Sequence, residues 1–317
     1  MKVITLLLVF ATSASATTLK CEFSRNTMFG YVCEIRSVDL LAEEKVTIEH
    51  ADHHKGKTDA DVKMISFGQS TVNFVPNQIF TTFPNLEILD LLNVSMTKWN
   101  RDYIKNGKNL KRIWLAHNDL RELVDNSFMG ATGVENLVLH NNKIGKISDK
   151  AFNGLLQLKS IELQNNFMTS LAGNFFSPLK KLVEINLNEN QITKIDGNIF
   201  NGAVKLEFLN LGENQISTLP ENLFSNQQNL TLVFLHKNQI EKLPNRLFSG
   251  CPGLMELRLD NNQIKDIPND FFENNKKFKL LNIMGNKIEK FDGKILPADT
   301  ELLFLGKKFC RILSIPS

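Results

Sequence analysis

An asparagine returns at a fixed interval through most of this chain. Each one follows the last by 24 residues, with no insertion or deletion between them: Asn118, Asn142, Asn166, Asn190, Asn214, Asn238, Asn262 and Asn286. The surrounding sequence reads L-x-x-L-x-L-x-x-N-x-I, as from Leu182 to Ile192. Units this short bury their apolar side only by stacking on one another. The chain of 317 residues is therefore predicted to contain one domain built on this array, not two separate domains.

A second row of residues has the same period and supplies the apolar filling: Phe128, Phe152, Phe176, Phe200, Phe224, Phe248 and Phe272, with Phe80 and Ile104 extending it backwards. In one unit, Leu209 and Leu211 alternate with strand period, so both side chains point to the interior. Asn214 follows where the chain leaves the strand. Its amide has donors and an acceptor for backbone groups that are otherwise buried without partners. We expect the repeated asparagines to form a ladder.

With this repeat the chain resembles the extracellular "typical" leucine-rich repeat family over about two thirds of its length. The expected fold is an α/β solenoid, a leucine-rich repeat horseshoe with a parallel β-sheet on the concave side. Loops, 3-10 turns and short helices form the convex side. Parallel strands lie about 4.8 Å apart, whereas the return segments with their phenylalanines need more room. The stack must therefore curve, with its strands on the inside.

The chain divides into four predicted parts. Residues 1–16 read as a signal peptide, with Lys2, an apolar run and a small-residue cleavage site at Ala14-Ser15-Ala16. Residues 17–61 form an N-terminal cap, 62–291 hold about ten repeats, and 292–317 form a C-terminal cap or tail. The apolar run is shorter than the roughly 20 residues that span a membrane. We expect a secreted, extracellular protein without membrane insertion.

The array is irregular at both ends. Ser70 and Val94 stand where the first two units are expected to have asparagine. Terminal units are commonly atypical because they face a cap. Near the other end, residues 302–305 are predicted to pair as one last strand, and Lys307 and Lys308 to protect its open edge.

The four cysteines are expected to behave differently. In an oxidising compartment Cys21 and Cys33 are predicted to form a disulfide that closes the cap. Cys251 occupies a position that leucine holds in other units, so we expect a buried thiol. Cys310 is left over and is a candidate for an intermolecular disulfide, as in some mosquito immune proteins that the chain resembles. The alternative is a bond between Cys251 and Cys310.

The cap also contains a group of histidines and acids: His50, Asp52, His53, His54, Asp59 and Asp61. Their spacing matches no standard metal-binding pattern, and no cysteine joins them. We interpret the stretch as a solvated loop and predict no metal and no cofactor. Two N-x-S/T sequons, at Asn93 and Asn229, are candidate glycosylation sites. Asn229 precedes a strand where a glycan fits easily, whereas Asn93 leaves a strand near the concave rim.

No motif for catalysis is present: no G-x-S-x-G, no H-E-x-x-H and no phosphate-binding glycine loop. The repeat itself explains why His117, His140 and His236 lie on one surface, with the first two adjacent. We therefore expect no catalytic residues. The net charge of +3 without a basic cluster favours neither nucleic acid nor an anionic membrane as partner.

The open concave sheet is the expected binding surface. Its candidate ligand-binding residues are Arg112, Trp114, Glu162, Glu184, Asn186, Phe208, Asn210, Leu232, Phe234 and Arg258. Clustered aromatic side chains on a surface suggest contact with a partner. The alternative is that these positions carry an ordinary mixture of surface residues.

Three functions follow from these observations. The chain is similar to secreted arthropod leucine-rich repeat proteins, including leucine-rich immune proteins of mosquitoes. That resemblance implies recognition of a protein or microbial-surface ligand, in innate immunity. The alternative is a structural or adhesive extracellular protein that joins other chains. The third function, an enzyme, is disfavoured, because a regular solenoid rarely forms the pocket that catalysis needs.

Overall fold

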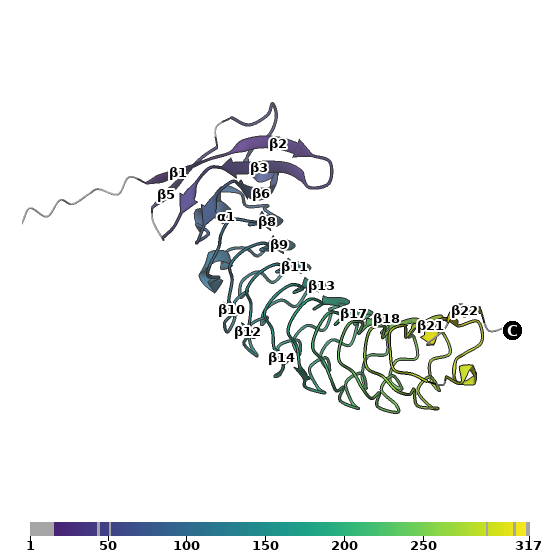
Figure 1. Cartoon of the computed structure of the whole chain (residues 1–317). Coiled ribbons are helices and arrows are strands. Elements are labelled where there is room, and N and C mark those ends of the chain that lie inside the picture. The colour runs from purple at the N-terminus through teal and green to yellow at the C-terminus, as the bar shows by residue number, and fades with distance from the viewer. Residues whose placement is uncertain (1–15, 43–44, 51, 290, 307–308, 315–317) are drawn as a thin grey trace, which may run out of the picture.

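The computed structural model describes residues 16–42, 45–50, 52–289, 291–306 and 309–314, and it forms a curved stack of turns (Figure 1). The predicted signal peptide lies outside these residues except for Ala16. A 14-stranded sheet joins the described turns, in the order β2-β3-β6-β8-β9-β11-β13-β15-β17-β18-β19-β20-β21-β22. Its strands in the array are β6 (Val62–Gly68), β8 (Ile88–Asp90), β9 (Arg112–Trp114), β11 (Asn136–Val138), β13 (Ser160–Glu162), β15 (Glu184–Asn186), β17 (Phe208–Asn210), β18 (Leu232–Phe234), β19 (Glu256–Arg258) and β20 (Leu280–Asn282).

Neighbouring strands of the array are parallel and pair in the register of the sequence repeat. Leu209, for example, pairs with Ile185 on one side and Val233 on the other. Leu209 is buried, whereas Phe208 and Asn210 on either side of it are half-buried. The middle residue of each strand thus faces the core, and the two others face the concave surface.

The asparagine ladder is confirmed. The Asn190 Nδ2 donates to the carbonyl oxygens of Leu163 at 3.0 Å and Leu187 at 3.1 Å. Its Oδ1 accepts from the Met168 N–H at 3.2 Å. Each amide therefore satisfies backbone groups of its own turn and of the preceding turn.

Ser70 takes over part of this role in the first unit. Its hydroxyl accepts from the Val38 N–H at 3.2 Å and donates to the Gly68 carbonyl at 3.0 Å. A shorter side chain suffices here because the turn below belongs to the cap.

The phenylalanine row explains the curvature. Successive rings from Phe128 to Phe248 stack with centroids 5.1 to 6.3 Å apart. The strands opposite are about 4.8 Å apart, so the convex side is the longer one. It carries turns, α1 (Gln78–Thr82), η2 (Arg101–Ile104), η3 (Gly293–Ile295) and short strands β10 (Glu122–Leu123), β12 (Lys146–Ile147), β14 (Ser170–Leu171) and β16 (Lys194–Ile195). The predicted horseshoe fold is confirmed.

A second periodic feature has only a weak signature in residue type, because five of its ten residues are asparagine or glycine. The residue before each ladder asparagine, and the matching residue of the first two units, has a positive φ between 50° and 67°. These residues are Gln69, Asn93, His117, Asn141, Asn165, Glu189, Glu213, Lys237, Asn261 and Gly285. Only Gly285 is a glycine, the residue type that adopts the left-handed region freely. The left-handed residue lies where the chain leaves the strand.

The N-terminal cap continues the sheet. The hairpin of β2 (Glu22–Asn26) and β3 (Gly30–Arg36) joins it through parallel pairing of β3 with β6. Beside it, β1 (Thr17–Lys20) pairs with β5 (Val46–Glu49), β4 (Asp39–Leu40) pairs with β7 (Thr71–Val72), and η1 (Asp59–Asp61) leads into β6. The predicted disulfide between Cys21 and Cys33 is present, with Cα atoms 5.0 Å apart.

At the other end, β21 (Glu301–Gly306) extends the sheet in parallel with β20, as predicted. The sequence interpretation missed β22 (Phe309–Ser314), which turns back to pair antiparallel with β21. Lys307 and Lys308 lie outside the described residues. Cys310 lies on β22, in the part of the chain whose side chains are not described, so its intermolecular disulfide stays a prediction.

Cys251 is a free and fully buried thiol, as predicted. Its Sγ donates to the Phe224 carbonyl oxygen at 3.4 Å, as Gln227 Nε2 does to Phe200 at 2.8 Å one repeat earlier. Burial raises the pKa of this thiol to about 12. The side chain is therefore an uncharged part of the core.

Candidate ligand-binding face

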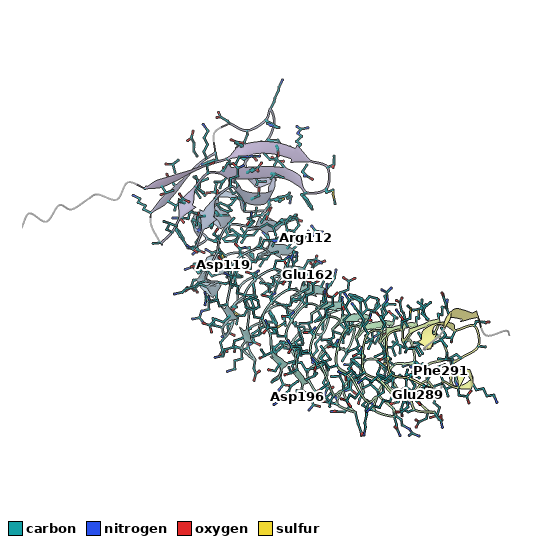
Figure 2. The ribbon with its side chains drawn as sticks, in the orientation of Figure 1. Arg112, Asp119, Glu162, Asp196, Glu289 and Phe291 are labelled. Carbon is teal, nitrogen blue, oxygen red and sulfur yellow. A yellow bond between two sulfur atoms is a disulfide. The ribbon has the colours of Figure 1, made fainter. Side chains whose placement is uncertain are left out.

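All ten candidate ligand-binding residues lie at the first or third position of strands between β9 and β19. These positions face the concave side, because the second position of each strand is buried. Figure 2 shows Arg112 and Glu162 along the strands, away from Asp119 and Asp196. The structure thus brings the predicted residues onto one continuous surface.

Three of them form an apolar cluster, which we call the apolar patch: Phe208, Leu232 and Phe234. The rings of Phe208 and Phe234 meet edge to face, with centroids 5.3 Å apart at 84°. Leu232 pairs directly with Phe208 across the adjoining strands. All three side chains are half-buried, so the patch is less exposed than the sequence suggested. Each side chain still presents part of its surface to solvent.

Charged side chains border the apolar patch. The Arg258 guanidinium lies 4.5 Å from the centre of the Phe234 ring, and its Nε contacts Glu256 Oε1 at 2.6 Å. Lys237 Nζ lies 3.1 Å from Glu213 Oε1. A cation over an aromatic face is held by the ring quadrupole. The Phe234 ring therefore contacts both the Phe208 ring and the Arg258 guanidinium.

Amide and acidic side chains occupy the middle of the face, and part of their capacity is already used. The Oδ1 atoms of Asn186 and Asn210 accept from the N–H groups of Asn188 and Gly212, at 3.3 and 3.0 Å. These two asparagines thus stabilise the turn that follows their strand.

Glu162 has two polar neighbours in the same region. Its Oε2 accepts from Gln164 Nε2 at 3.2 Å and lies 3.7 Å from His140 Nε2. Burial lowers the pKa of His140, and the charge of Glu162 opposes this effect. The rings of His117 and His140 lie 5.2 Å apart, as the repeat predicted. Glu184 is exposed on the next strand.

The N-terminal end of the face is partly covered by the cap. The Phe29 ring, in the turn between β2 and β3, meets Trp114 edge to face with centroids 5.3 Å apart. The half-buried Trp114 thus has an aromatic partner within the chain. Arg112, at the other end of β9, is half-buried.

Sequence reasoning missed Asp90, although it lies one repeat before Trp114 in the same row. Burial raises its pKa to about 6, the hydrogen bond from the Leu92 N–H opposes this, and the nearby charge of Glu34 adds to it. The sequence offered one signal for a perturbed carboxyl group here: Asp90 is an acidic residue in a predicted strand next to the N-terminal cap.

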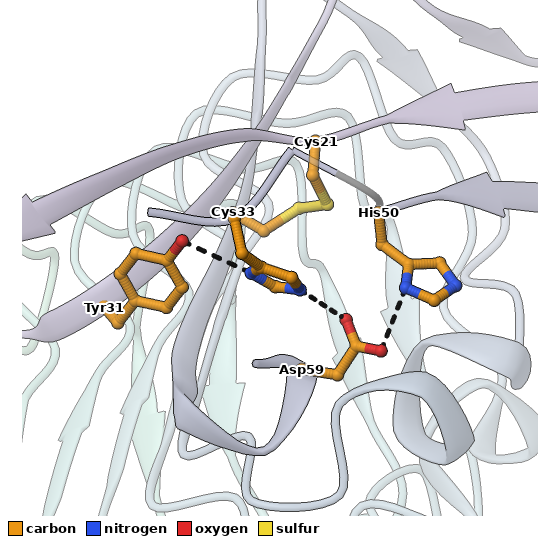
Figure 3. The surroundings of a disulfide bond; sticks show 6 residues. Cys21, Tyr31, Cys33, His50 and Asp59 are labelled. Atoms are coloured by element: carbon orange, nitrogen blue, oxygen red, sulfur yellow. Dashed lines mark hydrogen bonds and ion pairs between the residues drawn. A yellow bond between two sulfur atoms is a disulfide. The ribbon is translucent and has the colours of Figure 1, made fainter. Parts of the chain in front are cut away.

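The interpretation of the cap histidines as a solvated loop is wrong for part of the stretch. His53 keeps only 14% of its side chain exposed, and its ring stacks on Phe23 with centroids 4.0 Å apart. Both His53 and His50 contact the Asp59 carboxylate (Figure 3). The structure therefore brings His50, His53 and Asp59 together, three of the six histidines and acids that the sequence analysis grouped.

Both sequon asparagines are exposed. The Asn229 Nδ2 donates to the Val204 carbonyl at 3.0 Å, and the Thr231 hydroxyl donates to the Glu207 carbonyl at 3.0 Å. Asn93 lies at one of the left-handed positions. Glycosylation of either site stays a prediction.

The curved stack, the parallel concave sheet and the asparagine ladder define a leucine-rich repeat solenoid. The chain belongs to the leucine-rich repeat family: residues 58–155 and 145–279 match the BspA type leucine rich repeat region in six copies. The sequence assignment to the leucine-rich repeat proteins is confirmed, whereas the similarity to secreted arthropod members stays a prediction. No curated protein matches the chain.

Two solved structures align with parts of this chain. A chain from the structure of the Toll–Spatzle complex of Drosophila aligns with a TM-score of 0.60 and 19% identity, over 78% of this chain and 38% of that chain. A chain of the TLR13–ssRNA13 complex aligns with a TM-score of 0.46 and 19% identity, over 73% and 44%. The protein thus spans less than half the length of both neighbours. At 19% identity, the likeness to the chain of the Toll–Spatzle complex shows the fold alone. No helix among the described residues is long and apolar enough to cross a membrane.

Proposed function

We propose that this chain is a secreted binding protein that recognises a protein ligand through the apolar patch on its concave face. The observation that carries the proposal is the arrangement around Phe234, whose ring contacts both Phe208 and Arg258 while part of the side chain faces solvent. Binding hot spots combine a central aromatic anchor with a charged rim. A fixed ring also loses little conformational freedom when a partner covers it.

The repeat family supports this function, because solenoids expose an extended surface that is suited to binding other molecules. The structurally similar Toll–Spatzle complex is described as a hub in development and innate immunity. We infer a comparable recognition role here, in innate immunity. The amino-terminal sequence supports secretion. The middle of the face, with Glu162 and Glu184, adds negative charge that selects a partner with basic groups.

A capture experiment tests the proposal. The mature chain is immobilised and exposed to body fluid of the source organism, and the retained proteins are quantified by mass spectrometry. Phe234→Ala is compared with Phe167→Ala, which removes a phenylalanine that is 48% exposed and lies outside the strands of the concave sheet. We expect that the wild type and Phe167→Ala retain the same partner protein and that Phe234→Ala does not retain it. Equal retention by Phe234→Ala would contradict the proposed site. Retention of only matrix components would favour the structural or adhesive function.

A further inference from the structure

We propose that His50, His53 and Asp59 of the N-terminal cap form a binding site for a divalent transition-metal ion such as Zn²⁺. The carboxylate of Asp59 lies between the two imidazoles, with its Oδ2 2.9 Å from His50 Nδ1 and its Oδ1 3.0 Å from His53 Nε2. Figure 3 shows the contact between His50 and Asp59, near the Cys21–Cys33 disulfide. One donor atom from each of the three residues lies within 4.8 Å of the others.

The spacing suits a tetrahedral ion. Zn²⁺ binds imidazole nitrogen and carboxylate oxygen at about 2.0 to 2.2 Å, so neighbouring ligand atoms are about 3.3 Å apart. The two observed nitrogen–oxygen distances are a few tenths of an ångström shorter and involve different oxygens of the Asp59 carboxylate, so an ion would bind after a small movement of the carboxylate and the rings. His50 has 45% of its side chain exposed, which leaves its ring free to adjust. The donor set is two imidazoles and one carboxylate, which is typical of zinc sites and unsuited to calcium, an ion that prefers oxygen ligands alone.

The surroundings fix the ring of His53 as metal sites require. Its Nδ1 lies 3.3 Å from the Tyr31 hydroxyl, and that hydroxyl accepts from the His54 N–H at 3.0 Å. A histidine that binds a metal through one ring nitrogen commonly donates the other N–H to a neighbouring oxygen. When Nε2 binds the ion, the proton of neutral His53 resides on Nδ1 and faces the Tyr31 oxygen. Stacking on Phe23 holds the plane of the ring.

The charge balance also favours a cation. Asp59 supplies one negative charge, and the two neutral imidazoles supply none. The nearby Lys57 is paired with Asp61 at 2.8 Å, which offsets its positive charge. His50 follows β5 and Asp59 begins η1. A bound ion would therefore connect the two ends of the loop between β5 and η1. The exposed side of His50 leaves the fourth ligand position for water or for a group of a binding partner.

The test uses the full mature chain without an affinity tag, stripped with EDTA and dialysed. Zn²⁺ is added in a calorimetric titration and in thermal unfolding, with Ca²⁺ as a comparison ion. We expect one Zn²⁺ per chain and a rise in Tm with Zn²⁺ but not with Ca²⁺. His50→Gln and Asp59→Asn should each weaken Zn²⁺ binding at least tenfold.

His54→Gln is the matched control, because its side chain is outside the set while its backbone N–H still meets Tyr31. It should bind Zn²⁺ as the wild type does. His117→Gln, in the pair of histidines on the array, should also bind normally. The proposal is overturned if the wild type shows neither binding heat nor a Tm rise, or if His50→Gln and Asp59→Asn both bind as tightly as the wild type. The histidine–aspartate contacts would then be a hydrogen-bonded structural network only.

Discussion

The side-chain amide of Asn190 donates to the carbonyl oxygen of Leu163, which lies 27 residues earlier and one turn away, at 3.0 Å. Asn214 repeats the contact with Leu187 at 3.1 Å. Each ladder asparagine therefore links two successive turns as well as closing its own. The ladder couples the repeats, in addition to the apolar stacking between them.

Asn190→Ala is expected to destabilise the protein by on the order of 1 to 3 kcal/mol, because it leaves buried backbone groups without partners. Asn188→Ala is the control, since Asn188 is half-buried and its Nδ2 contacts only the exposed Glu189 among the described side chains. It should change stability little. Denaturant midpoints of the two variants provide the comparison, and equal midpoints would contradict the ladder's role.

Asp90→Asn is expected to stabilise the protein near neutral pH. The folded pKa of Asp90 is about 6, above its ordinary value of 3.8, so the folded state holds more protons between these two values. Stability from this group is therefore present below about pH 4 and is lost as pH rises through about 6. The variant should gain roughly 1 to 3 kcal/mol at about pH 7 and little at about pH 4. Unfolding at both pH values measures this, and a gain of the same size at both would disprove the ionisation effect.

The left-handed position of the repeat is expected to limit which residue types it accepts without loss of stability. Glu189 has a φ of 53°, which a β-branched residue adopts only with strain. Glu189→Val should cost about 1 to 2 kcal/mol, whereas Glu189→Asn should cost little because asparagine tolerates this region. Thermal unfolding separates the two. Gln191→Val, at an exposed position without positive φ, serves as the control.

The thiol of Cys251 should be unreactive in the folded protein. It is fully buried, and burial raises its pKa to about 12, so it neither ionises nor meets reagents. In a Cys310→Ser background, a thiol-specific reagent should modify no cysteine in native protein and one cysteine in denaturant. Rapid labelling of Cys251 under native conditions would show that this part of the core opens.

Much of the fold followed from the sequence because the repeat places the same residue type in the same environment. Asn190 and Phe200 each stand in a row of identical neighbours, so one period predicted the ladder, the stacked rings and the curvature. The left-handed residues were not predicted because asparagine or glycine occupies only five of the ten positions, and residues such as Glu189 and Lys237 interrupt the pattern. Strand β22 was missed because it lies beyond the last regular unit.

The candidate site was predicted less completely, since contacts between the cap and the array have no period. Phe29 meets Trp114 because a hairpin turn reaches the concave face, and nothing in the spacing of the two residues indicates it. His50 and Asp59 are nine positions apart and meet only through the path of the cap. The apolar patch was predictable because strand register alone brings its residues together.

The most direct test of the concave-face proposal is the affinity of Phe234→Ala for the captured partner, measured by calorimetry beside the wild type and Phe167→Ala. Loss of a central aromatic anchor costs about 2 kcal/mol or more. We predict binding weakened at least tenfold in Phe234→Ala with an unchanged fold by circular dichroism, and wild-type affinity in Phe167→Ala. Lys237→Ala, at the rim, should mainly alter the dependence of binding on salt. Unchanged affinity in Phe234→Ala would contradict the proposal and place the binding site on the cap or the convex side.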